Sequence, residues 1–226
     1  MAVSATVDLR NQFGPVRNQG KRPTCMAFAA SDAHAGLRDG WYPLSCEYIF
    51  YKAQRRAGRA PASGALLSAT LAALHDDGQP EESGWPYLPN TPDDAGWAPP
   101  VSIGPVFGRN GATAKHAVDH IAAQLDQGVP VITLTKLSIS FFAPSADALV
   151  IPGPGEIPDP NIRHALVAVG HGKLGADRFI LVRNSWGDGW GDQGYAWLSE
   201  GFLLQGLYAA ATLMENVDVS ANSAAA

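Results

Sequence analysis

The chain has 226 residues, of which 46% are hydrophobic and 16% charged, and its formal net charge is −5 at pH 7. This length and hydrophobic content suit one large domain or two lobes that share an interface. The negative charge argues against non-specific binding to nucleic acid or to an anionic membrane surface. The sequence contains no apolar run of about 18 residues that would predict a transmembrane helix, and its start lacks the pattern of a signal peptide.

The first half of the chain predicts helices. Residues 1–24 have no regular pattern, although Val7 and Leu9 could belong to a strand. Helices are expected at 25–39, at 46–57 after a capping serine, and at 66–76, and glycines at positions 40 and 78 would end the first and the third. Residues 79–111 are rich in proline and glycine and predict a long ordered connection. A further helix is expected at 113–127.

The second half of the chain predicts strands, which are expected at 130–135, 164–169, 179–182, 195–198 and 208–213. A proline- and glycine-rich excursion at 143–160 separates the first two of them. The tail, 218–226, is small and polar and is expected to be disordered. A helical half followed by a strand-rich half predicts an α+β fold, with a helical lobe at about 10–111 and a β-rich lobe at about 112–217 to which the N-terminal segment crosses over.

The two cysteines, Cys25 and Cys46, are the candidate nucleophiles, and we interpret both as thiols rather than as a disulfide. Cys25 is expected at the first turn of a helix that Thr24 caps. The partial positive charge of a helix N-terminus stabilises a thiolate and lowers its pKa below the usual value of about 8.5. Cys46 also begins a predicted helix and is the weaker candidate. The alternative for either cysteine is packing as a small buried side chain.

A thiol nucleophile needs a base, and the sequence offers six histidines. Four of them lie in or beside predicted helices, have polar neighbours and are expected at the solvated surface: His34, His75, His116 and His120. Two of these, His116 and His120, are spaced like a pair of metal ligands, but no third ligand is evident, so we predict no metal site. His171 is interpreted as a turn residue beside two glycines. His164 opens an apolar strand and is therefore the preferred base.

Residues 184–195 contain four glycines and two tryptophans, a composition that predicts a loop with packed aromatic side chains. Asn184, at its start, could accept the second ring N–H of His164 and fix the tautomer of that ring. Trp186 could then cover the hydrogen bond and keep water away from it. Taken alone, the segment could equally be a structural turn with a hydrophobic plug.

His164 lies 139 residues after Cys25, and Asn184 follows 20 residues later. Together with the VDLR segment at 7–10, the NQG of 18–20 and the segment 184–195, this spacing resembles the papain-like (C1) cysteine peptidases, and we expect a bacterial-type member without disulfides. The resemblance implies a single catalytic domain over 1–217. It also implies a two-lobe fold with a helical lobe, an antiparallel β-barrel-like lobe and an active-site cleft between them.

The resemblance implies a role for each of four residues. Cys25 would attack the scissile carbonyl, and His164 would be its ion-pair partner and general acid. Asn184 would orient the imidazole. Gln19 would donate a side-chain N–H that forms an oxyanion hole with the backbone N–H of Cys25, and a purely structural role in the loop is the alternative for Gln19. No cofactor is implied.

The sequence departs from the family around the nucleophile. The usual C-G-S-C-W is here Arg22-Pro23-Thr24-Cys25-Met26, so the cysteine that precedes the nucleophile and the tryptophan that follows it are both missing. Cys46 does not replace that first cysteine in sequence position. These differences favour a cytoplasmic or other reducing setting.

The resemblance also points to residues that would bind substrate. Gly64 lies where similar peptidases have glycines that contact an extended peptide, since a residue without a side chain permits close approach. The remaining substrate-binding candidates would line or rim an apolar pocket for the second residue before the cut: Ala65, Leu66, Leu134, Ile162, Arg163, Ala165 and Trp186. We expect an aliphatic or aromatic substrate residue there, with tolerance for acidic neighbours because of the positive charge of Arg163.

The leading interpretation is a monomeric endopeptidase that acts on peptides or proteins. One alternative is an exopeptidase, amidase or transpeptidase that uses the same acyl-enzyme, because the excursion at 143–160 could occlude one end of a cleft. The other alternative is a peptidase-like binding module without turnover. The family usually has an inhibitory propeptide, and none is recognised in this sequence. The alternatives are a propeptide that has been removed, and control by location, by a regulatory domain or by a binding partner.

Overall fold

The structure is a computed structural model that describes residues 2–219. It is α+β with mostly antiparallel strands, as predicted. The chain forms two compact units. The first contains the chain up to Asn18 and Thr113–Thr212, and the second contains Gln19–Ala112 and the described residues from Leu213 onward. Most of the predicted disordered tail, from residue 220, lies outside the described residues.

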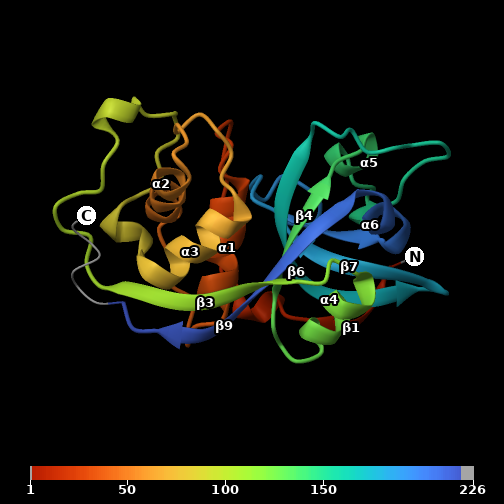
Figure 1. Cartoon of the computed structure of the whole chain (residues 1–226). Helices are drawn as coiled ribbons and strands as arrows, with labels where there is room; N and C mark the ends of the chain where they lie inside the picture. Colours follow the sequence, from red (N-terminus) through yellow and green to blue (C-terminus); the bar gives the residue numbers. More distant parts are fainter. Residues whose placement is uncertain (1, 220–226) are drawn as a thin grey trace. The chain divides into compact units, whose positions relative to one another are not determined.

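Three helices make the core of the second unit: α1 (Cys25–Gly36), α2 (Cys46–Ala57) and α3 (Leu67–Asp76). They pack against one another (Figure 1). Helix α2 begins where the sequence predicts because the Ser45 hydroxyl accepts a hydrogen bond from the Tyr48 N–H at 3.0 Å. It ends where Gly58 takes a left-handed conformation with φ of 61°.

Helix α1 differs from its prediction in two ways. It ends at Gly36, before the expected end at residue 39. The sequence also predicts that Met26, Ala29, Ala30, Ala33 and Leu37 form one apolar face, whereas every residue from Met26 to Gly36 is buried. Most of these side chains are as small as alanine, so neighbouring segments approach the helix from all sides.

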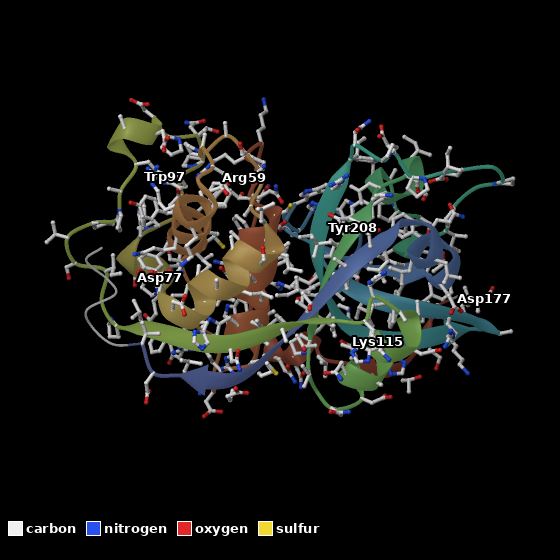
Figure 2. All side chains as sticks on the ribbon, in the orientation of Figure 1. Arg59, Asp77, Trp97, Lys115, Asp177 and Tyr208 are labelled. Carbon is white, nitrogen blue, oxygen red and sulfur yellow. The ribbon has the colours of Figure 1, made fainter. Side chains whose placement is uncertain are left out.

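Charged side chains join α2 to the end of α3. Asp77, which Figure 2 labels, directly follows α3 and is buried. Its carboxylate lies 3.3 Å from Nζ of Lys52 and 2.6 Å from Nε of Arg56, both on α2. The buried acid thus has two cationic partners, as a buried carboxylate requires.

The predicted connection at 79–111 is partly wrong, because its end forms a strand. It contains β2 (Gln79–Pro80), two short 3-10 helices, η2 (Glu82–Gly84) and η3 (Asp94–Gly96), and the start of β3 (Val106–Ala114). Strand β3 lies between β2 and β9 in the sheet order. A Cβ on Gly108 would overlap the carbonyl oxygen of Val217, so glycine permits the close approach of these backbones. Tertiary pairing, not local propensity, makes this segment a strand.

The first unit is built on a sheet whose order is β9-β4-β6-β7-β8-β5, with β1 also paired to β6. Paired neighbours are antiparallel except β5 and β8. The strands are β1 (Ser4–Asp8), β4 (Val131–Lys136), β5 (Leu149–Val150), β6 (Arg163–Leu174), β7 (Asp177–Arg183), β8 (Tyr195–Ser199) and β9 (Leu207–Val217), whose last residues belong to the second unit. The unit also contains η1 (Arg10–Gln12), α4 (Val118–Leu125), α5 (Ile139–Phe142) and α6 (Glu200–Gly206).

The interpretation of His171 as a turn residue is wrong. It lies inside β6, opposite Val7 of β1 and Ile180 of β7, and its Nε2 is 2.8 Å from Oδ1 of Asp126. The glycines on either side of His171, Gly170 and Gly172, do not form a turn. A Cβ on Gly170 would lie 2.5 Å from the carbonyl oxygen of Val7, so these glycines let β1 approach β6.

The two histidines that are spaced like metal ligands, His116 and His120, do not share a helix. Helix α4 begins at Val118, so His116 precedes it and only His120 belongs to it. The expected helix at 113–127 is therefore shorter at both ends. Across residues 2–219, no group of three or more His, Cys, Asp or Glu side chains is arranged to hold a metal ion. In the same range, no helix has the length and apolar character of a membrane span.

The expectation that His34 lies at the solvated surface is wrong, because the side chain is fully buried in α1. Its Nδ1 is 3.3 Å from Oε1 of Gln79, which can only accept, so Nδ1 carries the proton. Nε2 is buried without a hydrogen-bond partner. Burial, with help from the charges of Arg109 and Arg38, lowers the pKa of His34 to about 3.

We predict that His34 makes the protein sensitive to acid. Its ordinary pKa is 6.5, so as pH falls from 6.5 to about 3 the unfolded chain binds a proton there and the folded chain does not. The free energy of unfolding should therefore decrease over that window, by roughly 3–5 kcal/mol from this residue. Urea unfolding between pH 7 and pH 4 should show a smaller decrease for His34→Gln than for wild type. His75→Gln, at an exposed position, is the control, and an equal decrease in all three proteins would contradict the prediction.

Candidate active site

Cys25 is the first residue of α1, in the second unit, and is half-buried. Thr24 is the residue before the helix, but its side chain does not cap it, contrary to expectation. The Thr24 hydroxyl lies 2.8 Å from the hydroxyl of Tyr87, which donates its own proton to the carbonyl of Gln19 at 2.7 Å. Thr24 is therefore the donor to Tyr87. A twelve-residue helix begins at Cys25, so its N-terminal N–H groups favour a negative charge on the sulfur.

The loop that leads to Cys25 is held by its own hydrogen bonds. The Gln19 side chain is buried, and its Nε2 donates to the carbonyl of Arg22 at 2.8 Å. The Thr24 N–H donates to the same carbonyl at 2.9 Å. An amide NH₂ has two N–H donors, and the bond to Arg22 uses one of them. The loop thus sets the orientation of the Gln19 amide beside the start of α1.

His164 is the second residue of β6, in the first unit, and Asn184 directly follows β7. Strands β6 and β7 are paired, which brings the two side chains together. Nε2 of His164 lies 2.7 Å from Oδ1 of Asn184. The same oxygen accepts the backbone N–H of Ser185 at 2.8 Å. An amide oxygen cannot donate, so Nε2 of His164 carries the proton and Nδ1 keeps its lone pair.

Aromatic side chains surround this imidazole. The ring of Trp186 has its centroid 4.8 Å from that of His164, and the ring of Phe141 lies 5.9 Å away. Phe141 also contacts Trp186 and Trp190, and the indole N–H of Trp190 donates to the Phe141 carbonyl at 3.0 Å. Trp186 therefore lies where it covers the imidazole. The contribution of Phe141 is not evident in the sequence, because it lies in the four-residue helix α5, which has no periodic signal.

Burial governs the protonation of His164. It lowers the pKa of the ring to about 4, and the hydrogen bond to Asn184 opposes this shift only in part. With the partners that its own unit provides, the His164 ring is therefore neutral at physiological pH. A neutral imidazole with a bare Nδ1 can take a proton from a thiol.

The loop at 184–195 depends on glycines at tight positions. Gly194 has φ of 87°, and a Cβ there would lie 2.5 Å from Cγ1 of Val16. The buried guanidinium of Arg183, just before the loop, donates to the carbonyls of Gly14 and Pro15 at 2.8 and 2.7 Å. These bonds attach the loop to the N-terminal segment of the same unit.

The structure places Gln19 in the loop before α1 and Cys25 at the start of that helix, both in the second unit, and His164, Asn184 and Trp186 together in the first. Their catalytic roles stay predictions. The alternative nucleophile is not accessible, because Cys46 is fully buried at the start of α2 and its N–H donates to Glu82 at 3.2 Å.

The substrate-binding candidates also divide between the units. Gly64 and Ala65 are half-buried and Leu66 is exposed in the loop before α3 of the second unit. In the first unit, Leu134 of β4 lies opposite Ala165 of β6. Next to them, Ile162 and Arg163 are exposed at the start of β6. No contact with a substrate tests these candidates, and they stay predictions.

Comparisons with known proteins address the family. A family model described as "Papain family cysteine protease" matches residues 108–212. Cathepsin J of Mus musculus is 27% identical over 80% of this chain, and a cathepsin L-like peptidase of Aedes aegypti is 29% identical over 85%. Xylellain, a cysteine protease from Xylella fastidiosa, has a structure that matches 94% of this chain and 86% of its own, with a TM-score of 0.75 at 22% identity.

The chain is thus similar in sequence and in fold to papain-like cysteine peptidases. The segment that the family model matches includes His164 and ends beyond Asn184. The chain spans 55% of the length of cathepsin J and 58% of that of the cathepsin L-like peptidase. The bacterial type that the sequence suggests stays a prediction.

We predict that Asn184 fixes the tautomer of the His164 ring and raises its pKa. In a Cys25→Ala background, ¹⁵N NMR should show a protonated Nε2 and a bare Nδ1 at neutral pH. Adding Asn184→Ala should lower the pKa of His164 further, because the hydrogen bond that raises it is lost. Asn184→Asp keeps an acceptor oxygen and adds a negative charge, so it should raise the pKa. Ring signals that are the same in all three proteins would contradict the prediction.

Proposed function

We propose that this chain is a cysteine peptidase that hydrolyses peptide bonds through a thioester acyl-enzyme, with Cys25 as nucleophile and His164 as base and acid. The observation that carries the proposal is the 2.7 Å hydrogen bond between His164 and Asn184, because it leaves Nδ1 bare to take a thiol proton. The similarity to papain-like cysteine peptidases and the position of Cys25 at the start of α1 support it.

In the proposed first step, Nδ1 of His164 takes the proton of the Cys25 thiol. Sγ then attacks the carbonyl carbon, a C–S bond forms, and the carbonyl electron pair moves to the oxygen. The backbone N–H of Cys25 and the side-chain N–H of Gln19 would donate to this oxyanion. When the intermediate collapses, the C–N bond breaks and Nδ1 returns its proton to the leaving amine.

In the second step, Nδ1 takes a proton from a water molecule, and the hydroxide attacks the thioester carbon. The C–S bond breaks, and Cys25 leaves as a thiolate that recovers the ion pair with His164. Burial outweighs the hydrogen bond to Asn184 and lowers the pKa of this imidazole to about 4, so a stable imidazolium needs an adjacent anion. The Cys25 thiolate would be that anion, and each charge of the pair would stabilise the other.

We further propose that residues of both units contact the substrate. Gly64 would pair with the backbone of an extended peptide, and apolar side chains such as Leu66 and Leu134 would contact the second residue before the cut. Arg163 would favour acidic groups nearby. An aliphatic or aromatic residue is therefore expected at that substrate position.

We predict that wild type cleaves an unbiased peptide mixture and that Cys25→Ala does not, because only the sulfur can form the acyl-enzyme. Mass spectrometry of the products gives the cleavage sites. Internal sites with an apolar residue two positions before the cut indicate an endopeptidase. Cleavage confined to chain ends, or transfer to an added amine, indicates one of the alternative reactions on the same acyl-enzyme.

A thiol-directed label separates these outcomes from a binding module without turnover. At mildly acidic pH the label should react at Cys25 and spare Cys46, which is buried. His164→Ala should slow that reaction, because the thiolate loses its partner. A short bis-alkylating reagent should also bridge Cys25 and His164, since the mechanism requires these side chains to meet. Absence of both selective labelling and the bridge would overturn the proposal.

We predict that Gln19→Ala lowers kcat by about a hundred- to a thousand-fold, which is typical of losing one oxyanion donor. KM should change little, because the donor acts on charge that develops in the transition state. Gln19→Glu, which is similar in size but adds an anion, should be at least as slow. Steady-state kinetics on a single peptide found in the mixture would measure this, and a loss confined to KM would show that Gln19 only binds substrate.

A further inference from the structure

A buried ion pair joins the loop that leads to Cys25 to helix α2. The side chains of Arg22 and Glu47 are 1% and 0% exposed. Nη1 of Arg22 lies 2.6 Å from Oε2 of Glu47, and Nη2 lies 3.0 Å from Oε1. Both residues belong to the second unit, Arg22 in the loop and Glu47 in the first turn of α2. Two parallel N–H to oxygen bonds define the position of a guanidinium more strictly than one bond would.

The partners of this ion pair are also fixed. The indole N–H of Trp97, labelled in Figure 2, donates to Glu47 Oε1 at 2.7 Å, and the Leu88 N–H donates to Oε2 at 3.1 Å. Arg22 donates in addition to the Leu88 carbonyl at 2.6 Å, and its guanidinium lies over the ring of Tyr87, 5.0 Å from the centroid. The carboxylate thus receives four hydrogen bonds, which repay part of the cost of burying it.

The main chain of Arg22 has a separate task from its side chain. Its carbonyl accepts the hydrogen bonds from Nε2 of Gln19 and from the Thr24 N–H. Pro23 follows, and a residue before proline is restricted to extended conformations. A displacement of the Arg22 side chain would therefore move the carbonyl that orients the Gln19 amide.

We propose that Arg22 is a positioning residue that, through its ion pair with Glu47, holds the Gln19 amide in the orientation that the oxyanion requires. This rests on the proposed function, in which Gln19 is an oxyanion donor. Arg22 stands at the position of the first cysteine of the usual C-G-S-C-W sequence. A buried, forked ion pair thus anchors the loop three residues before Cys25.

The pair is better suited to positioning than to stabilising the fold. Removing two charges from water costs several kcal/mol per ion, and apolar replacements of buried pairs are often as stable or more so. What the fork supplies is a defined geometry. A 1 Å displacement of a catalytic group can cost about a hundred-fold in rate.

The main test is Arg22→Lys, since lysine keeps the charge but cannot form the two-pronged bond to Glu47. We expect kcat to fall by about ten- to a hundred-fold with KM within about threefold. In a Gln19→Ala background the same substitution should change kcat by less than about threefold, because the group it positions is absent. Arg55→Lys is the matched control. Arg55 lies on α2, as Glu47 does, and donates to the carbonyl of Trp97, but its hydrogen bonds do not reach the loop before Cys25.

A second variant separates positioning from folding. Arg22→Met combined with Glu47→Gln removes both charges together and leaves no buried ion unpaired. We expect this protein to unfold at a urea concentration similar to wild type and still to have the reduced kcat. Full recovery of kcat together with stability, or equal effects of Arg22→Lys with and without Gln19, would overturn the proposal.

An additional readout does not depend on turnover. In a Cys25→Ala background, the side-chain NH₂ signals of Gln19 should shift and exchange faster with solvent after Arg22→Lys, and should be unchanged after Arg55→Lys. If wild type proves inactive, the proposed peptidase function fails, and this measurement still decides whether Arg22 orients Gln19. Unchanged Gln19 signals after Arg22→Lys would refute the positioning role by themselves.

Discussion

The hydrogen bond between His164 and Asn184 is the constraint on which the proposed chemistry depends. A thiol can lose its proton only to an atom with a lone pair, and the Asn184 oxygen leaves that lone pair on Nδ1. The Ser185 N–H also donates to this atom, which shows that it is the oxygen of the amide and not the nitrogen. The pairing of β6 with β7 brings His164 and Asn184 together, and Trp186 and Phe141 cover the ring. Sheet pairing and aromatic packing thus both help to keep the proton of His164 on Nε2 and the lone pair on Nδ1.

The second unit solves a different problem, which is to hold a loop without regular structure around a nucleophile. Here the hydrogen bonds run from side chains to main-chain carbonyls. Tyr87 donates to Gln19, and Gln19 donates to Arg22. The ion pair of Arg22 with Glu47 lies beneath them and joins the loop to α2. Such a network is costly if it is incomplete, because each buried polar group then lacks a partner.

Several predictions from the sequence are wrong for one reason, which is that local composition does not reveal a residue's neighbours in the folded protein. The polar neighbours of His34 in the sequence suggest exposure, yet the small residues of α1 let other segments surround it. The glycines beside His171 suggest a turn, yet they let β1 approach β6. The excursion at 143–160 hides the short strand β5, whose pairing with β8 is visible only in the folded chain.

The sequence by itself determined the α+β class, the helix that begins at Cys25 and the family resemblance, because these depend on local periodicity and on fixed spacings along the chain. It also named His164 and Asn184 as a pair, through their positions at a strand and a loop. Only the tertiary structure decided which ring nitrogen carries the proton, that Phe141 joins the aromatic cover, and that Arg22 pairs with Glu47. These depend on distances between residues far apart in the sequence, and such distances are set by packing rather than by local preference.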